Sequence, residues 1–144
     1  ANRIKGLGPN SWGMSACISP STGYSGKYGS FPIGAGYKLL EDGTVAPYGA
    51  LSFLPFTPQA SIEALQHMYE IPGLVGKYGL YDSYSYVTKA KGNLPWIGKS
   101  YLGIDKGLVL LMFENYSTQL IWKLLHQNKS IQKGLKRLAF RQIN

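Results

Sequence analysis

The chain has few of the residues on which several common classes of protein depend. It contains one cysteine, Cys17, so an internal disulfide bond is excluded. Its two histidines, His67 and His126, form none of the spacings typical of zinc ligands, and we expect no metal site. No apolar run reaches the ~18 residues that a membrane-spanning helix requires, so we expect no membrane partner.

Acidic residues are also scarce, at seven against 15 lysines and arginines, which gives a net charge of +8. None occurs after Glu114. The basic residues of the tail are Lys123, Lys129, Lys133, Lys136, Arg137 and Arg141. A basic patch is typical of nucleic-acid binding, but a solvated helix face with cations near helix C-termini explains the same residues. Because the first 115 residues are nearly neutral, we expect no nucleic-acid partner.

Aromatic residues are plentiful, whereas charged residues make up only 15% of the chain. Soluble domains average roughly 25% charged residues, and 11 of the aromatic residues here are tyrosines. A surface rich in tyrosine and poor in charge suits neutral ligands with many hydroxyl groups better than phosphates. The composition therefore favours a sugar over a nucleotide.

Residues 1–41 are typical of loops, because they contain eight glycines and three prolines. Their glycine spacing only loosely resembles a dinucleotide-binding loop. No strand pattern precedes it and no helix pattern follows it, so we expect no cofactor. An aromatic-rich loop of this length is expected to be ordered and functional.

Helical patterns cover much of the remaining chain. We expect helices over residues 46–54, from Thr57-Pro58 to Pro72-Gly73, and over about 105–116, 117–127 and 128–140. Residues 108–113 are six apolar residues in a row, so that helix must be buried on all sides, whereas the last two helices are amphipathic. The alternation of Tyr84 and Tyr86 could form a short strand. The predicted fold class is all-α, part of an (α/α)6 toroid with long aromatic loops and little or no β-structure.

Four motifs in order make the chain resemble a known family. They are NSWGMSACISPSTGY (10–24), DGTVAPYGALSFLPFTPQASIEAL (42–65), YGLYDSY (78–84) and YLGIDKGLVLLMFENY (101–116). Together they resemble the C-terminal part of the glucoamylase-like domain family, which includes bacterial endo-β-1,2-glucanases and the related domain of cyclic β-1,2-glucan synthases. The resemblance covers the chain from Asn10 to Phe140. It implies an (α/α)6 toroid that acts on glucans.

The resemblance also implies that residues 1–144 are an incomplete C-terminal portion of a catalytic domain. A whole toroid has twelve helices, and the part of the family that carries its principal acidic residues has no counterpart here. We therefore expect a portion of a glycoside hydrolase acting on a β-1,2-linked glucan, inactive alone. The expected partners are the glucan and either the missing N-terminal half or a second copy of the chain, since apolar helix flanks would otherwise be exposed. A glucan target suggests a periplasmic or secreted bacterial protein.

Aromatic side chains in loops are the first candidates for substrate binding, since a pyranose ring packs its apolar face on an aromatic ring. These candidates are Trp12, Tyr24, Tyr37, Tyr81 and Tyr101. Each of them could equally belong to the core. A carbohydrate-binding module without catalysis therefore remains an alternative function, and a basic nucleic-acid-binding protein is a second one.

The carboxylates complete the list of candidates. Asp105 could hydrogen-bond a sugar or simply favour the start of a helix, and Asp42 could be a sugar contact or a turn residue. Asp105 and Glu114 are nine residues apart on one helix, or roughly 13 Å along its axis, so we do not expect them to form one catalytic pair. The catalytic residues thus stay unassigned from the sequence.

Overall fold

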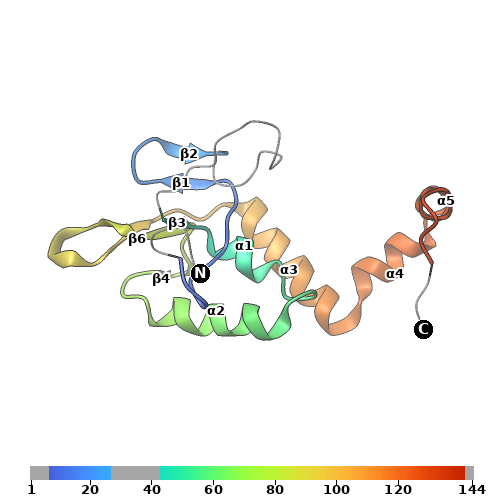
Figure 1. Ribbon diagram of the computed structural model, residues 1–144, viewed down its shortest axis with the longest axis horizontal. Helices are drawn as coiled ribbons and strands as arrows, with labels where there is room; N and C mark the ends of the chain where they lie inside the picture. The colour runs from blue at the N-terminus through green and yellow to red at the C-terminus, as the bar shows by residue number, and fades with distance from the viewer. Residues whose placement is uncertain (1–6, 27–42, 142–144) are drawn as a thin grey trace.

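The computed structural model describes residues 7–26 and 43–141. Five α-helices lie in the described part of the chain: α1 (Pro47–Leu51), α2 (Pro58–Glu70), α3 (Gly103–Thr118), α4 (Leu120–Gln127) and α5 (Lys129–Arg137), with a short 3-10 turn at Lys91–Asn93. Seven short strands accompany them: β1 (Cys17–Ser19), β2 (Gly23–Ser25), β3 (Thr44–Val45), β4 (Val75–Gly76), β5 (Gly79–Leu80), β6 (Ser83–Lys89) and β7 (Pro95–Gly98). Figure 1 shows the strands gathered at one end and the helices extending from them.

The predicted all-α fold class is wrong, because the strands form three antiparallel sheets. The largest has the order β3-β6-β7, and the other two are the hairpins β1-β2 and β4-β5. Strand β6 has the sequence SYSYVTK, in which β-branched and aromatic residues favour extended structure. The other strands have only two to four residues, too few to show a period of two. For that reason the sequence predicts loops in the other glycine- and tyrosine-rich segments, whereas the short strand that it indicates at Tyr84 and Tyr86 is confirmed by β6.

The hydrophobic core lies between the β3-β6-β7 sheet and helices α1 and α2. Tyr84 of β6 and Val45 of β3 are fully buried against Ala50, Ala64 and Met68 from the two helices. Gly13 lies so close to this layer that an added Cβ would stand 2.4 Å from the carbonyl oxygen of Ala46. The sheet and the first two helices therefore form one packed unit, against which α3 lies.

Helices α1 and α2 begin where the sequence predicts. Each carries a proline in its first turn, where the missing N–H costs nothing. Helix α2 ends at Glu70, and Gly73 then adopts a φ of 80°, which favours glycine. These two boundaries confirm the turn signals at Pro58 and at Pro72-Gly73.

Helix α3 is present as predicted, but the expectation that it is buried on all sides is not met within this chain. Its buried residues are Asp105 and Asn115, which are polar, whereas Leu110 is 71% exposed. The helix also runs past the predicted cap at Ser117-Thr118 and ends where Gln119 takes a left-handed conformation. Much of its apolar surface thus faces outward.

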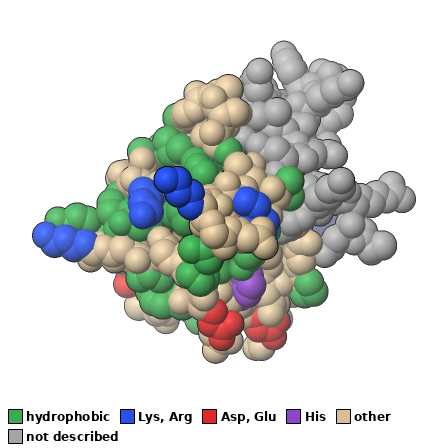
Figure 2. Space-filling model, turned by 90° about the vertical axis from the view of Figure 1, so that its left-hand side faces the viewer, with side chains coloured by type: hydrophobic (Ala, Val, Ile, Leu, Met, Phe, Trp, Pro, Cys, Tyr) green, Lys and Arg blue, Asp and Glu red, His purple; other side chains and the backbone are tan. Residues whose placement is uncertain are grey.

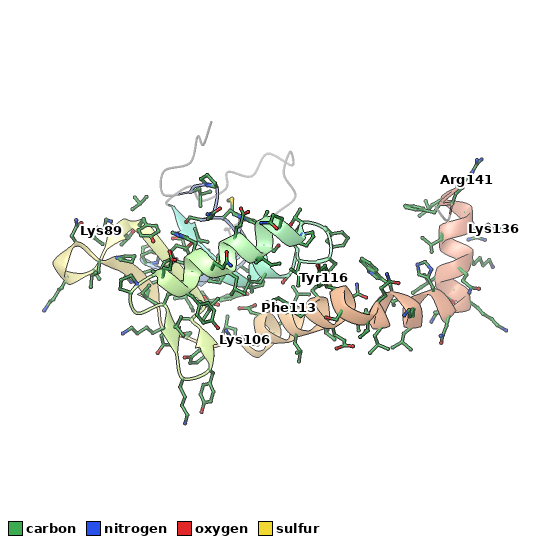
Figure 3. The ribbon with its side chains drawn as sticks, turned by 90° about the horizontal axis from the view of Figure 1, so that it is seen from below. Lys89, Lys106, Phe113, Tyr116, Lys136 and Arg141 are labelled. Carbon is green, nitrogen blue, oxygen red and sulfur yellow. The ribbon has the colours of Figure 1, made fainter. Side chains whose placement is uncertain are left out.

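Helices α4 and α5 form an arm that leads away from the packed unit (Figure 1). In Figure 3 the labelled residues Lys136 and Arg141 lie at the far end of this arm, while Phe113 and Tyr116 lie on α3 where the arm departs. Within the described residues, no helix is both long and apolar enough to cross a membrane.

Candidate active site

A cavity of about 320 Å³ opens between helices α1, α2 and α3. Its polar and charged lining consists of Tyr48, Tyr69, Tyr81, Asp82, Asp105 and Lys106. Its apolar lining is larger and includes Leu51, Leu65, Leu80, Leu102, Val109, Leu110 and Phe113. Asp105 and Lys106 lie in the first turns of α3 and Phe113 two turns later, so the charged groups gather toward one end of the cavity.

Two buried aspartates lie side by side in the cavity wall. Asp82 precedes β6, Asp105 lies in the first turn of α3, and each side chain is 5% exposed. Their carboxyl groups hydrogen-bond to one another. Oδ1 of Asp82 and Oδ2 of Asp105 have no partner among the described residues. Buried polar atoms are normally paired, so two unpaired carboxyl oxygens side by side are unusual in a purely structural wall.

The surroundings of Asp105 raise its pKa from 3.8 to about 7. Burial is the largest cause, because it penalises the charged form, and the hydrogen bond with Asp82 and that residue's negative charge add to it. The charge of Lys106 acts in the opposite direction. Near neutral pH the Asp105 carboxyl group can therefore hold a proton and give it up, as a general acid must.

Lys106 is the cation of the site. Its ammonium group donates a hydrogen bond to the carbonyl oxygen of Leu80 and lies 5.5 Å from the centre of the Tyr101 ring. Burial lowers its pKa, while the nearby Tyr101 and Asp105 raise it. Lys106, which is labelled in Figure 3, thus connects the start of α3 to strand β5.

Tyrosines surround the two carboxyl groups. The Tyr48 hydroxyl donates to the carbonyl oxygen of Ala16 (2.9 Å) and lies 2.6 Å from Oγ of Ser15. Burial raises the pKa of Tyr48 to about 12, and the charge of Asp105 adds to the effect. The pKa of Tyr24 is also raised, by burial and then by the charges of Asp105 and Asp82, although its side chain is 54% exposed. Both hydroxyls therefore stay neutral donors near the aspartates.

Tyr81 and Tyr101 stack on one another, with ring centres 4.8 Å apart. Tyr78 meets the Tyr101 ring edge-on at 5.4 Å. The pair rests on Gly76, where an added Cβ would stand 2.2 Å from the Tyr101 hydroxyl. Because each ring of the stack covers one face of the other, only the outer faces could receive a sugar.

The structure brings part of the predicted set together. Asp105 and Tyr81 line the cavity, Tyr101 stacks on Tyr81, and Tyr24 lies within electrostatic reach of the aspartates. Trp12 packs instead against the hydrophobic core. Tyr37 and Asp42 lie outside the described residues.

The sequence interpretation missed Asp82, Tyr48 and Lys106. Asp82 is not among the candidates that the sequence gives, and Tyr48 enters there only as a position in the helix predicted over residues 46–54. Their roles depend on contacts with residues far away in the chain. The one local signal is that Lys106 follows Asp105 directly, which places two opposite charges in the first turns of a helix.

Residues 1–129 match the model of the Glycoamylase family, whose description is "Putative glucoamylase". The chain belongs to this family. A curated relative, the exo β-1,2-glucooligosaccharide sophorohydrolase (non-reducing end) of Parabacteroides distasonis, is 35% identical over 100 residues. That match spans 68% of this chain and 13% of the relative.

Solved structures of similar proteins extend the comparison. The endo-β-1,2-glucanase from Chitinophaga pinensis, in complex with sophorotriose and glucose, is 38% identical with a TM-score of 0.70. The match covers 94% of this Glycoamylase-family chain and 30% of that one. A Bacteroides fragilis protein described as a glucoamylase is 35% identical with a TM-score of 0.73, over 99% of this chain and 31% of its own. The chain therefore spans about 30% of the length of these solved relatives.

Proposed function

We propose that this chain is the C-terminal portion of a hydrolase that acts on β-1,2-glucan. The observation that supports this most strongly is the Asp105 carboxyl group, which lies in the wall of a tyrosine-lined cavity with a pKa of about 7. Two relatives named for β-1,2-linked substrates support the class of substrate. A polymeric glucan as substrate further suggests a periplasmic or secreted bacterial protein.

Asp105 has the properties of the acid in this reaction. Its proton passes to the glycosidic oxygen as the bond from that oxygen to the anomeric carbon breaks, and water supplies the hydroxyl group of the new sugar end. The hydroxyl of Tyr48 and the ammonium group of Lys106 lie in the same wall and can orient sugar hydroxyls. Each of these groups acts from a position fixed by helix α1 or α3.

Asp82 does not fit the second catalytic role. The two carboxyl groups of a glycoside hydrolase stand about 5–5.5 Å apart in retaining enzymes and roughly 6.5–9.5 Å apart in inverting ones, on either side of the bond. Asp82 and Asp105 instead touch through a hydrogen bond, which leaves no room for a sugar between them. Asp82 is therefore not the second carboxylate, and we propose that the upstream part of the domain supplies it.

We propose that the upstream part of the domain also covers the exposed apolar surface of this chain. A second copy of the chain is the alternative partner for that surface. This surface consists of Ile104, Leu108, Leu110, Leu111, Leu120, Leu124 and Leu125 on α3 and α4. Light scattering with size exclusion tests the need for a partner: we expect self-association and binding of an apolar dye. A stable monomer of 15.8 kDa without dye binding would contradict it.

Charge distribution confines the nucleic-acid alternative to the arm. On the face shown in Figure 2, lysine and arginine side chains are separated by hydrophobic and polar ones and form no continuous basic surface. Cations gather instead on the arm, where α5 carries Lys129, Lys133, Lys136 and Arg137. Polymer binding that collapses with rising salt would favour the nucleic-acid reading over the glucan one.

The function is tested by fragment complementation. The chain is mixed with the two thirds of the Chitinophaga pinensis enzyme that it does not match, and reducing ends released from β-1,2-glucan are counted. We expect no release from either piece alone and release from the mixture, with β-1,3-glucan left intact. Binding of β-1,2-glucan without release in any combination would instead indicate a non-catalytic carbohydrate-binding module.

A further inference from the structure

Asp82 and Ser83 hold a single residue of the neighbouring hairpin from both sides. The backbone N–H of Ile18 donates to Oδ2 of Asp82 at 2.5 Å, and the Ser83 hydroxyl donates to the carbonyl oxygen of Ile18 at 2.7 Å. The backbone N–H of Asp82 is itself fixed to the carbonyl oxygen of Ser100 at 3.1 Å. Asp82 is therefore held by two other segments of the chain, at Ile18 and at Ser100, before it meets Asp105.

These contacts make the two aspartates unequal. An amide N–H that points at a carboxyl oxygen stabilises the ionised form of that group, and charge-assisted hydrogen bonds are among the short, strong ones. Each aspartate has one oxygen without a partner in the described part of the chain, Oδ1 of Asp82 and Oδ2 of Asp105. The difference between them is the Ile18 N–H, which donates to Oδ2 of Asp82. When the pair carries one negative charge and one proton, the charge is better accommodated on Asp82 and the proton on Asp105.

The other groups that face Asp105 do not move the proton from Asp105 to Asp82. Lys106 of α3 favours an ionised Asp105, but its charge is a smaller influence than burial and Asp82. Tyr48 of α1 and Tyr24 of β2 have raised pKa values and stay neutral near pH 7. The Cys17 thiol of β1 is buried, and it is the smallest of the influences that raise the pKa values of these two tyrosines. The hydrogen bond between Asp105 and Asp82 is thus the specific contact that distinguishes Asp105 from an ordinary buried acid.

We propose that Asp82 is a positioning residue: fixed as a carboxylate by the Ile18 amide, it keeps the proton of the pair on Asp105, ready for transfer. The inference rests on the proposed function only where it says that the proton goes to the glycosidic oxygen. Which of the two aspartates holds the proton is a property of this chain alone. A measurement that follows ionisation therefore tests it separately from any sugar chemistry.

The chain suits such a measurement because it has three aspartates, Asp42, Asp82 and Asp105. Labelling aspartate carboxyl carbons with ¹³C gives three NMR signals that can be followed from pH 3 to 9 in the 144-residue chain. In the wild-type chain the Asp105 signal is expected to titrate near pH 7. In Asp82→Asn, which keeps an acceptor oxygen for Ile18, the midpoint of Asp105 is expected to move to a lower pH, at a proton concentration at least tenfold higher. Ser83→Ala, which breaks only the other bond to Ile18, is expected to leave the midpoint in place.

Each outcome decides the inference. An Asp105 midpoint that does not move in Asp82→Asn overturns it, and so does a transition near pH 7 that belongs to the Asp82 signal. If Asp82→Asn fails to fold, the wild-type spectra decide: a transition near pH 7 in the Asp105 signal with no matching transition in the Asp82 signal supports the assignment, and the reverse overturns it. A correct titration together with no glucan hydrolysis in the complementation assay would retain the positioning role and reject the proposed function.

Discussion

Asp82 and Asp105 hydrogen-bond through their carboxyl groups, although one lies between two strands and the other opens helix α3. The contact joins the strand end of the molecule to the helix that leads into the arm. It also makes the protonation of one side chain a property of the fold, because two buried carboxylates in contact cannot both ionise at low cost.

Stability should depend on pH through Asp105. Its pKa is 3.8 as a reference and about 7 in the folded chain, so the folded state retains a proton that the unfolded state has released over this window. The resulting stabilisation is complete below about pH 4 and is lost as the pH rises through 7. Asp105→Asn cannot ionise and should gain stability relative to wild type between pH 4 and 8 in urea unfolding. Glu70→Gln, at an exposed position on α2, should show no such relative gain.

Gly76 should not tolerate a side chain. A Cβ there would lie 2.2 Å from the Tyr101 hydroxyl and 2.5 Å from Cζ of Tyr81, so Gly76→Ala should cost about 1–3 kcal/mol through overpacking. Gly107→Ala is the matched control, because its Cβ would meet nothing within 4 Å on helix α3 and should stabilise by about 0.5–1 kcal/mol. Chemical denaturation of both variants checks the contrast, and equal effects at the two sites would count against the stacked tyrosine pair.

The hydroxyl of Tyr84 contributes to the core. It lies 2.9 Å from Oγ of Ser11, and the tyrosine is fully buried with a pKa raised to about 12 by burial. Tyr84→Phe removes this bond and should destabilise the chain by about 0.5–1.5 kcal/mol. Tyr69→Phe, at a largely exposed site on α2, should change the unfolding free energy by much less. An unchanged free energy of unfolding in Tyr84→Phe would show that the hydrogen bond between residues 11 and 84 does not form.

Asn115 should hold the start of the arm. Its side-chain oxygen accepts the backbone N–H of Trp122 at 3.1 Å, so it caps helix α4 from the preceding helix. Asn115→Ala should cost about 1 kcal/mol and speed amide hydrogen exchange in α4. Asn128→Ala, which removes the cap of α5 at Ser130 and Ile131, should loosen α5 alone. Exchange that rises equally along the whole arm in both variants would contradict these separate caps.

The sequence predicted the helices better than the sheets. Proline and glycine mark the ends of α2, and the apolar run at 108–113 marks α3, because these signals are local. The strands pair residues as distant as Val45 and Tyr84, and two- to four-residue strands leave no periodic pattern to find. The all-α expectation failed for this reason.

The candidate site, like the fold, was predictable from the sequence only where the signal is local. Asp105 stood out because a carboxylate at the start of an apolar helix is a local feature. Asp82 did not, since its partners are Ile18, Ser100 and Asp105, and no spacing in the sequence brings them together. Tyr81 and Tyr101 were predicted singly as sugar platforms, whereas their stacking on one another appears only in three dimensions.

Loss of activity in Asp105→Asn is the most direct test that this chain supplies the acid of a β-1,2-glucan hydrolase. The assay is release of reducing ends from β-1,2-glucan by the chain combined with the complementary part of the Chitinophaga pinensis enzyme. The account predicts release with wild type and with Glu70→Gln, and at least a hundredfold less with Asp105→Asn, in the range of a lost general acid. Equal release by Asp105→Asn and wild type would contradict it.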